Sequence, residues 1–211
     1  MIRVVLVDDH AIVRMGFRML LQAEGSGIEV VGEAADGEAL LQQWPAWAPD
    51  VVVMDLSMPG LGGLETLRRL RARDSAPPVL VLSAHEDTAH PRRALNAGAL
   101  GYLSKRSAPE TLPEAIRAVA RGRRYLDAQT AQALALSQLD GAASPFDALS
   151  EREFEVFVRL ARGRSVNDIA SQLSLSPSTV GTHLYNIKQK LAAANQAELT
   201  LLALRWGVID A

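Results

Sequence analysis

The chain has 211 residues, of which 48% are hydrophobic and 22% charged, and its formal net charge is −2. This length gives room for one large or two ordinary domains, and the composition is typical of a soluble globular protein rather than a disordered one. The absence of cysteine excludes disulfides, thiol catalysis and cysteine-based zinc sites, and the near-neutral charge gives no overall signal for nucleic acid or membrane.

The first residues do not have the pattern of a targeting or membrane segment. The apolar run over residues 2–7 is cut off by Asp8 and Asp9 and is too short for a signal peptide. No apolar stretch of the sequence approaches the roughly 18 residues that a membrane span needs. We therefore expect a cytoplasmic protein that does not enter a membrane.

Four short apolar runs end on polar side chains. They cover residues 3–9, 51–55, 78–83 and 100–105 and end on Asp8 and Asp9, Asp55, Ser83 and Lys105. Such runs predict buried parallel strands, and open α/β sheets bind ligands at the carboxyl ends of their strands. Three carboxylates, a hydroxyl and an ammonium at that edge predict a site for Mg²⁺ and a phosphoryl group. Each residue alone could be a turn or capping residue, but capping does not explain acids on two strands and a lysine on a third.

Helical patterns fill the segments between these runs. A further short strand is predicted over residues 28–32, and helices over residues 10–24, 36–44, 65–73, 87–97 and 107–121. The first helix has apolar residues at helical spacing, namely Ile12, Met15 or Gly16, Met19 and Leu20. Asp36 is a predicted cap, Pro45 a predicted stop, and Ser107 with Glu110 a predicted capping box. Five alternating strand–helix units predict an α/β doubly wound fold with a five-stranded parallel sheet.

The rest of the chain has the pattern of a linker and an all-α domain. Residues 123–147 form a predicted linker, helical over residues 128–139, and no strand is predicted beyond residue 122. Four helices are then predicted to begin at Ser150, Ser165, Ser176 and about Gln196, the first with a capping box closed by Glu153. Two short helices joined by a tight turn, the second entered by a Ser-Pro cap, predict a helix-turn-helix over residues 165–191.

The third of these helices carries a polar face opposite its apolar one. Val180, Leu184, Ile187 and Leu191 recur at core spacing. The candidate DNA contacts are Ser178, Thr179, Gly181, Thr182, His183, Tyr185, Asn186, Lys188, Gln189 and Lys190. An ordinary solvated face has the same periodicity, but residues 169–197 contain no acid where composition predicts about three. From residue 146 onward seven basic and seven acidic residues balance, so we expect modest DNA affinity per monomer.

The last helix predicts a dimer surface. Its apolar residues at helical spacing are Leu199, Leu202, Ala203 and Trp206. A three-helix core does not plainly need this much apolar area, so we expect a second copy to cover it. Simple core packing is the alternative.

Both halves resemble known families. The set Asp8, Asp9, Asp55, Ser83 and Lys105 resembles the receiver domain of two-component response regulators, over residues 1–122. The motifs that begin at Ser150, Arg162, Asp168, Leu175 and Thr182 resemble the LuxR-type helix-turn-helix, over residues 148–211. The whole chain thus resembles a NarL/FixJ-class response regulator. It departs from the family pattern at Val166, Gly181 and Gln196, which bears on DNA affinity rather than fold.

The resemblance implies a fold, a set of roles and partners. The implied strand order is 2-1-3-4-5, and Asp55 is implied to accept a phosphoryl group from a histidine kinase. Mg²⁺ would bind Asp9, Asp55 and the Ser57 carbonyl, with Asp8 assisting through water. Ser83 and Lys105 would engage the phosphoryl oxygens, Tyr102 would reorient, and Ser57 and His85 would set the lifetime of the phosphorylated form. Double-stranded DNA would be bound by a homodimer, more tightly after phosphorylation.

Three other functions explain the sequence less completely. An aspartyl-nucleophile phosphohydrolase would also use Asp55 with Mg²⁺, but it leaves the helix-turn-helix unexplained. A constitutive DNA-binding protein would not need the complete acidic set. A dinucleotide site at the glycine-rich turn over residues 59–63 is not expected, because Glu65 stands where such a loop has its third glycine. We therefore predict a transcription regulator and not an enzyme.

Overall fold

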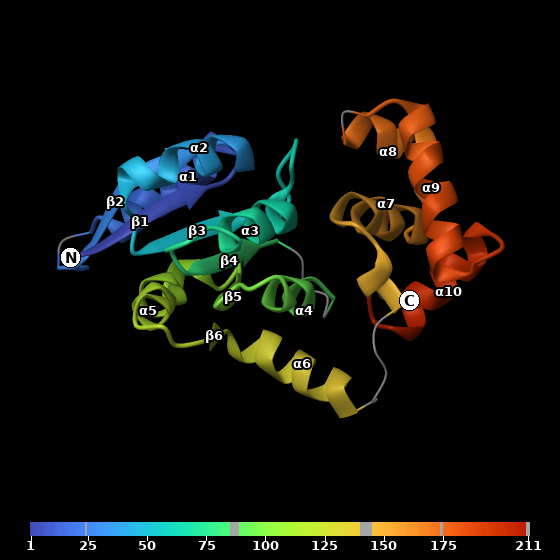
Figure 1. The fold of residues 1–211 in the computed structure, drawn as a ribbon. Coiled ribbons are helices and arrows are strands. Elements are labelled where there is room, and N and C mark those ends of the chain that lie inside the picture. Colours follow the sequence, from blue (N-terminus) through green and yellow to red (C-terminus); the bar gives the residue numbers. More distant parts are fainter. Residues whose placement is uncertain (24, 85–88, 140–144, 174, 210–211) are drawn as a thin grey trace. The chain divides into compact units, whose positions relative to one another are not determined.

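The computed structural model describes residues 1–23, 25–84, 89–139, 145–173 and 175–209. The chain divides into two compact units (Figure 1). The first consists of Met1–Glu86 and His90–Leu136, and the second contains Ser137–Ala211. The predicted domain boundaries after residues 122 and 147 stay predictions.

The first unit is built on one parallel sheet. Its strands are β1 (Ile2–Val7), β2 (Ile28–Ala34), β3 (Val51–Asp55), β4 (Val79–Ser83), β5 (Gly101–Ser104) and β6 (Tyr125–Leu126). Their order is β2-β1-β3-β4-β5-β6, and every neighbouring pair is parallel. The order of the first five strands is the one that the resemblance implied, and the α/β doubly wound class is confirmed.

The sixth strand corrects the prediction. Five strands were expected, with none beyond residue 122, but Tyr125 pairs with Gly101 and Leu126 with Tyr102. The Tyr125 amide donates to the carbonyl of Leu100 at 3.2 Å. A strand of two residues has no alternating pattern, so only its pairing with β5 identifies it.

Helices cover both faces of this sheet. On one face lie α1 (Ala11–Leu21) and α5 (Ala108–Ala120), which share a buried apolar cluster with the sheet. The other face is covered by α2 (Gly37–Trp47), α3 (Gly63–Arg71) and α4 (Ala89–Asn96). Since both faces are covered, the central strands β3 and β4 are buried along their whole length.

Two local expectations in this unit were wrong. Helix α2 continues through Pro45 instead of stopping at Trp44. Ser107 does not cap α5 with its side chain, because its hydroxyl donates to the Ser104 carbonyl at 3.1 Å instead. The apolar spacing correctly predicted α1 as a helix, but not all of its apolar residues are buried: Ile12, Met15 and Met19 are 80%, 56% and 70% exposed. Leu21, Phe17 and Leu20 form the packed side.

The second unit is helical. Helix α6 (Ala128–Leu139) leads into it along the chain, followed by η1 (Pro145–Ala148), α7 (Glu151–Ala161), α8 (Val166–Gln172), α9 (Pro177–Leu191) and α10 (Gln196–Arg205). Phe146, Phe154 and Phe157 form an aromatic cluster in its core, with ring centroids 4.8 to 5.9 Å apart. The capping box of Ser150 with Glu153 is confirmed, and Ser176 caps α9 through the Thr179 amide.

The predicted dimer surface on α10 needs correction. Leu199 and Ala203 are 0% exposed and belong to the core of this unit, while Leu202 and Trp206 are partly buried against it. The core of this unit thus fully covers two of the four side chains that were predicted to meet a second copy. Simple core packing, the alternative given by the sequence, therefore accounts for Leu199 and Ala203.

Candidate functional site

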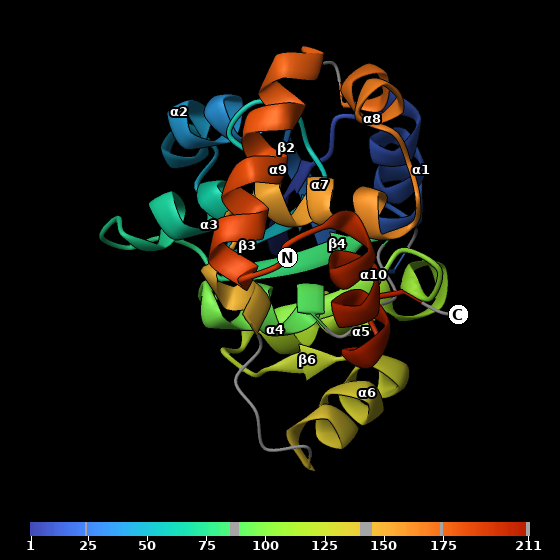
Figure 2. The same cartoon turned by 90° about the vertical axis from the view of Figure 1, so that its right-hand side faces the viewer.

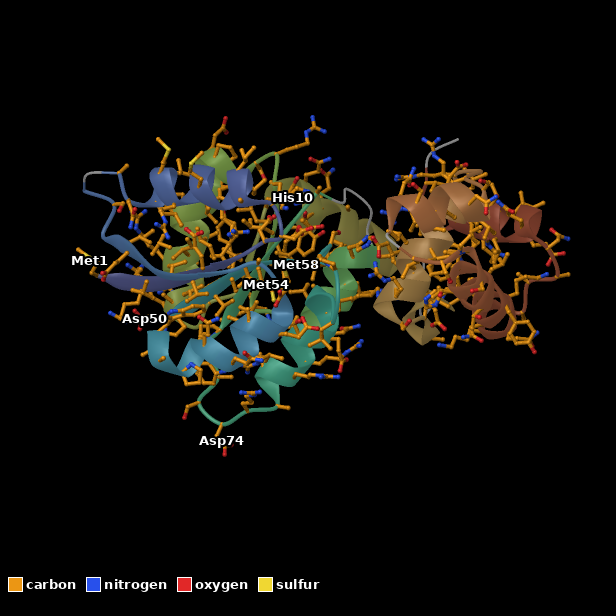
Figure 3. The ribbon with its side chains drawn as sticks, turned by 90° about the horizontal axis from the view of Figure 1, so that it is seen from above. Met1, His10, Asp50, Met54, Met58 and Asp74 are labelled. Atoms are coloured by element: carbon orange, nitrogen blue, oxygen red, sulfur yellow. The ribbon has the colours of Figure 1, made fainter. Side chains whose placement is uncertain are left out.

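The carboxyl ends of the strands bring three of the predicted site residues into contact. Asp8 and Asp55, at the ends of β1 and β3, are 5% and 3% exposed. The ammonium of Lys105 lies 2.6 Å from Asp8 Oδ2 and 2.8 Å from Asp55 Oδ2. In Figure 3 the residues just beyond β1 and β3, His10 and Met58, lie at the end of this unit opposite Met1 and Asp50.

The charges of this cluster depend on one another. Burial raises the pKa of Asp55, and the Asp8 carboxylate adds to that rise, while Lys105 opposes it. Burial alone would lower the pKa of Lys105, but attraction to Asp55 and Asp8 outweighs it, so the pKa of Lys105 is raised. Lys105 is therefore a partly buried cation held between two carboxylates. Its ammonium can form an ion pair with an anionic group that becomes attached to Asp55.

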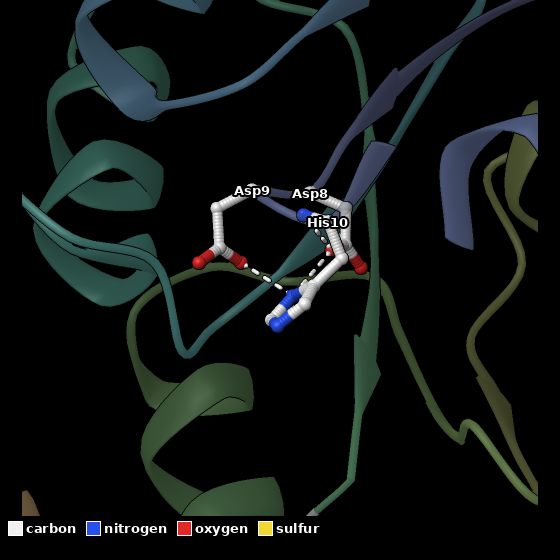
Figure 4. A group of neighbouring side chains, drawn as sticks. All are labelled: Asp8, Asp9 and His10. Carbon is white, nitrogen blue, oxygen red and sulfur yellow. Dashed lines mark hydrogen bonds and ion pairs between the residues drawn. The ribbon is translucent and has the colours of Figure 1, made fainter. Parts of the chain in front are cut away.

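The residues around Asp9 suit a divalent cation. Figure 4 shows Asp8, Asp9 and His10, each of which offers one ligand atom within 4.8 Å of the others. Asp9 Oδ1 is buried without a hydrogen bond, although His10 Nδ1 lies 2.9 Å away as an ion-pair partner. A buried carboxylate oxygen without a hydrogen-bond donor fits a hard cation such as Mg²⁺. His10 was not among the predicted site residues, although its place next to the acid pair is a visible signal in the sequence.

The remaining predicted residues of this site differ in their surroundings. Ser83 and Tyr102 are 0% and 1% exposed on β4 and β5, whereas Ser57 is exposed and its amide donates to Asp55 Oδ1 at 3.3 Å. His85 lies outside the described residues. The switching and lifetime roles of these four residues stay predictions.

Helix α9, labelled in Figure 2, has the two faces that the sequence predicted. Val180 and Ile187 are 0% exposed, Leu191 is 9% exposed, and Leu184 is partly buried against the same core. The exposed candidates for DNA contact are Ser178, Thr179, Thr182, Tyr185, Gln189 and Lys190, and the half-buried ones are Gly181, His183, Asn186 and Lys188. Tyr185, 64% exposed, is the bulkiest side chain of this surface.

Two of the candidates on α9 also face the unit's own acids and core. The Lys190 ammonium lies 2.6 Å from Glu153 Oε2 on α7, so a phosphate contact by Lys190 would compete with an ion pair. Burial lowers the pKa of His183, which favours its neutral form. Lys188 is therefore better suited to a phosphate contact than Lys190 or His183.

Glu153 links α7 to α9, and its removal gives a pH-dependent prediction. Glu153 accepts from the Ser150 amide at 2.8 Å and from Lys190. Burial would raise the pKa of Glu153, but these hydrogen bonds outweigh it, so its pKa is lowered from 4.5. A lowered folded-state pKa contributes stability above the unfolded value, and this stability is lost as pH falls through the folded value. We expect Glu153→Gln to lower the free energy of unfolding by about 1 kcal/mol at pH 7.

Urea unfolding at pH 7 and at acidic pH tests this expectation. The difference between wild type and Glu153→Gln should shrink as pH falls below 4.5. Glu155→Gln is the matched control, because Glu155 forms ion pairs with Arg152 and Arg159 along the same helix and should contribute little. A Glu153→Gln cost that is equal at both pH values would contradict the linkage.

The fold and the two sites together define a class of protein. A doubly wound unit with Asp55 and Lys105 at its strand ends, followed by a helix-turn-helix unit, is the organisation of a DNA-binding response regulator. Residues 4–117 match the model of the response regulator receiver domain, and residues 147–203 match that of the bacterial regulatory proteins of the luxR family. The chain belongs to the response regulators, in the NarL/FixJ class.

Curated relatives cover the whole chain. It is 44% identical over 213 aligned positions to the response regulator UvrY of Escherichia coli K12, covering 100% of this chain and 97% of that protein. It is 43% identical over 213 positions to the response regulator GacA of Pseudomonas aeruginosa, covering 100% of this chain and 99% of that protein.

Solved structures agree with this assignment. A structure of Salmonella typhimurium RcsB has a TM-score of 0.67 at 26% identity and covers 100% of this chain and 98% of that chain. A complex of RcsB with DNA has a TM-score of 0.60 at 28% identity, with 95% and 96% covered. In the part of this chain that the structure describes, no helix is both long and apolar enough to cross a membrane.

Proposed function

We propose that this chain is a transcription regulator in which Asp55 accepts a phosphoryl group from a histidine kinase and thereby increases DNA binding by the second unit. The observation that carries the proposal is the contact of the buried Asp55 carboxylate with the Lys105 ammonium at 2.8 Å. Asp55 offers a nucleophilic carboxylate, and Lys105 offers a charge that can follow the transferred group. Because a kinase and DNA are its partners, we infer that the protein works in the cytoplasm.

The transfer uses residues of this chain in named roles. One oxygen of Asp55 forms the bond to phosphorus as the bond from phosphorus to the donor's leaving atom breaks. Lys105 and Ser83 bind the phosphoryl oxygens, and Tyr102 responds to the inward movement of Ser83. Asp9, Asp55 and the Ser57 carbonyl would hold Mg²⁺, with Asp8 acting through water. Bound Mg²⁺ supplies positive charge that reduces repulsion between the carboxylate and the phosphoryl group.

On the DNA side, α9 would enter the major groove and a dimer would supply affinity. One solved structure shows two RcsB dimers bound to two parallel DNAs. We infer a dimer for this chain as well, since two modest binding units reinforce each other on one DNA. In place of Leu199 and Ala203, the proposed surface includes Leu201, which is 64% exposed on α10. Leu202 and Trp206 stay in the proposed surface.

DNA footprinting before and after phosphorylation tests the proposal. Acetyl phosphate with Mg²⁺ serves as the phosphoryl donor. Binding sites selected from a library of random DNA serve as targets. We expect tighter binding and protection of two half-sites after phosphorylation. A single protected half-site that does not respond to phosphorylation would contradict it. A phosphohydrolase is not favoured, because the family membership of both segments already accounts for Asp55 and for the helix-turn-helix.

Gly181→Lys should strengthen DNA binding. Position 181 lies near the start of the DNA-facing side of α9, and a Cβ there would meet no atom within 4 Å. Glycine in a helix interior also costs about 1 kcal/mol relative to alanine, so the substitution should not destabilise α9. One added phosphate contact would steepen the salt dependence of binding by about one unit, on specific and random DNA alike.

A salt titration of both proteins on both DNAs measures this effect. Weaker binding on the selected site alone would mean that Gly181 permits close approach to a base pair. Unchanged affinity and slope would mean that residue 181 does not face DNA. Gln42→Lys is a control that adds the same charge at an exposed position of α2 in the first unit, and it should leave both affinities unchanged.

Ser57→Asn should lengthen the life of the phosphorylated form. Ser57 is exposed and follows Asp55 by two residues, with its amide 3.3 Å from Asp55 Oδ1. A larger side chain here would obstruct the water that hydrolyses the acyl phosphate, and we expect decay to slow about threefold. Decay of label is measured after donor removal. The same decay in denatured chain is the control, since there the two proteins should not differ; equal decay in the folded proteins would contradict the role.

A further inference from the structure

The carboxylate of Asp127 joins the end of β5 to the start of α6. Asp127 directly follows β6 and is 8% exposed. Its Oδ2 accepts a hydrogen bond from the Ser104 amide at 2.9 Å, and its Oδ1 accepts one from the Thr130 amide at 2.8 Å. Asp127 lies outside the segment that matches the receiver family model, residues 4–117. Its contacts are thus not part of the pattern that identified the receiver.

The side chain of Asp127 provides a hydrogen-bond acceptor for β5 where β6 has ended. Strand β6 pairs with β5 over two residues, and the Tyr125 amide donates to the Leu100 carbonyl. Amides that face one neighbouring strand alternate along a strand, so Ser104 is the next donor on this edge after Tyr102. The backbone has turned into α6 by then, as the Ala131 amide donates to the Asp127 carbonyl at 2.9 Å. The side chain of Asp127 therefore supplies the acceptor that β6 is too short to supply.

Ser104 is the last residue of β5 and directly precedes Lys105, whose side chain reaches the acidic site. The Ser104 carbonyl accepts from the amide and the hydroxyl of Ser107, both at 3.1 Å. The Lys105 amide donates to the Ser83 carbonyl at 2.8 Å. With Asp127 on the Ser104 amide, the backbone on both sides of this peptide is held, and the Lys105 ammonium is aimed at Asp8 and Asp55.

We propose that Asp127 is a positioning residue for phosphoryl transfer to Asp55, acting through Ser104 on Lys105. The inference rests on the proposed roles of Asp55 and Lys105. Since one carboxylate serves both β5 and α6, the coupling between them is reciprocal. Engagement of a phosphoryl group by Lys105 tightens the first turn of α6, and loss of that turn displaces Lys105. Figures 1 and 2 show α6 following β6 at the edge of the sheet.

Asp127→Asn separates the two hydrogen bonds without changing side-chain size. The amide has one acceptor oxygen for two backbone donors, and asparagine caps helices about as well as aspartate. We expect the Thr130 amide to keep its acceptor. The Ser104 amide should exchange its hydrogen with solvent about tenfold faster, because it loses one charge-assisted hydrogen bond. The ¹⁵N signal of the Lys105 ammonium should move toward that of a free lysine. Both measurements use the full unphosphorylated chain.

Asp36→Asn is the matched control. Asp36 also caps a helix of this unit, accepting from the Ala39 amide at 2.8 Å at the start of α2. Its replacement should change neither the Ser104 exchange rate nor the Lys105 signal. A shift of the Lys105 signal of equal size in both variants would overturn the assignment to Asp127.

Phosphorylation kinetics complete the test. With acetyl phosphate and Mg²⁺, Asp127→Asn should lower the maximal phosphorylation rate about threefold to tenfold and leave the half-saturating donor concentration unchanged. Phosphorylation of wild type should slow amide exchange at Thr130 and Ala131. An unchanged rate and Lys105 signal, despite faster Ser104 exchange, would overturn the positioning role. Absence of label on wild type would instead overturn the proposed function, while the Ser104 and Lys105 measurements would still decide the positioning.

Discussion

Asp55→Asn abolishes Mg²⁺-dependent labelling by acetyl phosphate and removes the response of DNA binding to that donor. A carboxamide is not a usable nucleophile toward phosphorus, so the expected loss is complete rather than partial. The fold should survive, because asparagine has the same shape and Asp55 faces another buried carboxylate, Asp8. Burial and that carboxylate both raise the pKa of Asp55, which means that its charge is not a source of stability.

Labelling, urea unfolding and DNA binding are measured on the same Asp55→Asn preparation. Asp50→Asn is a control at the opposite end of the unit, where Asp50 accepts from the Arg3 amide at 2.8 Å (Figure 3). It should label as wild type does. Label that persists on another residue of Asp55→Asn, at a rate close to wild type, would end the assignment of the phosphoacceptor.

Lys105→Met destabilises the first unit and changes its response to Mg²⁺. The Lys105 side chain is 18% exposed, and its partners Asp8 and Asp55 are 7% and 4% exposed. Without the ammonium, two buried carboxylates face each other uncompensated, and we expect a loss of about 3 kcal/mol at pH 7 in the absence of Mg²⁺. Mg²⁺ should restore much of this loss, because it binds the folded state and no longer meets a competing cation.

The pH dependence follows from the directions of the two pKa shifts. The raised pKa of Lys105 means that its contribution is fully present below 10.5 and is lost only as pH rises through the folded-state value. Its removal is therefore felt across the neutral range. The pKa of Asp55 is already raised from 3.8 and should rise further in Lys105→Met, so acidification should protonate Asp55 and reduce the destabilisation.

Urea unfolding of Lys105→Met with EDTA and with Mg²⁺, at pH 7 and at acidic pH, measures these effects. Arg69→Met is the control, since Arg69 forms a surface ion pair with Glu65 at 2.8 Å and should cost under about 0.5 kcal/mol. A loss in Lys105→Met no larger than in Arg69→Met, and insensitive to Mg²⁺, would contradict a buried counter-charge.

The sequence by itself determined most of the elements and the centre of the first site. Buried strands are unbroken apolar runs, so the polar residue that ends each run could be located without knowing any contact. Because parallel strands end at one edge, Asp8, Asp55 and Lys105 were expected to meet, and they do. The start of α7 could also be predicted from neighbouring residues, since the Ser150 cap depends on Glu153 three residues later. The two faces of α9 followed from helical spacing.

Only the tertiary structure decided which apolar faces are covered and where short segments pair. The spacing of Ile12, Met15 and Met19 is that of a buried face, yet these residues are exposed because α1 packs through Leu21 and its neighbours. Leu199 is buried because α7 covers that side of α10. The pairing of β6 with β5 and the contact of Asp127 with Ser104 join residues more than 20 positions apart in sequence. Periodicity describes one element, whereas burial and pairing depend on the neighbours that other parts of the chain provide.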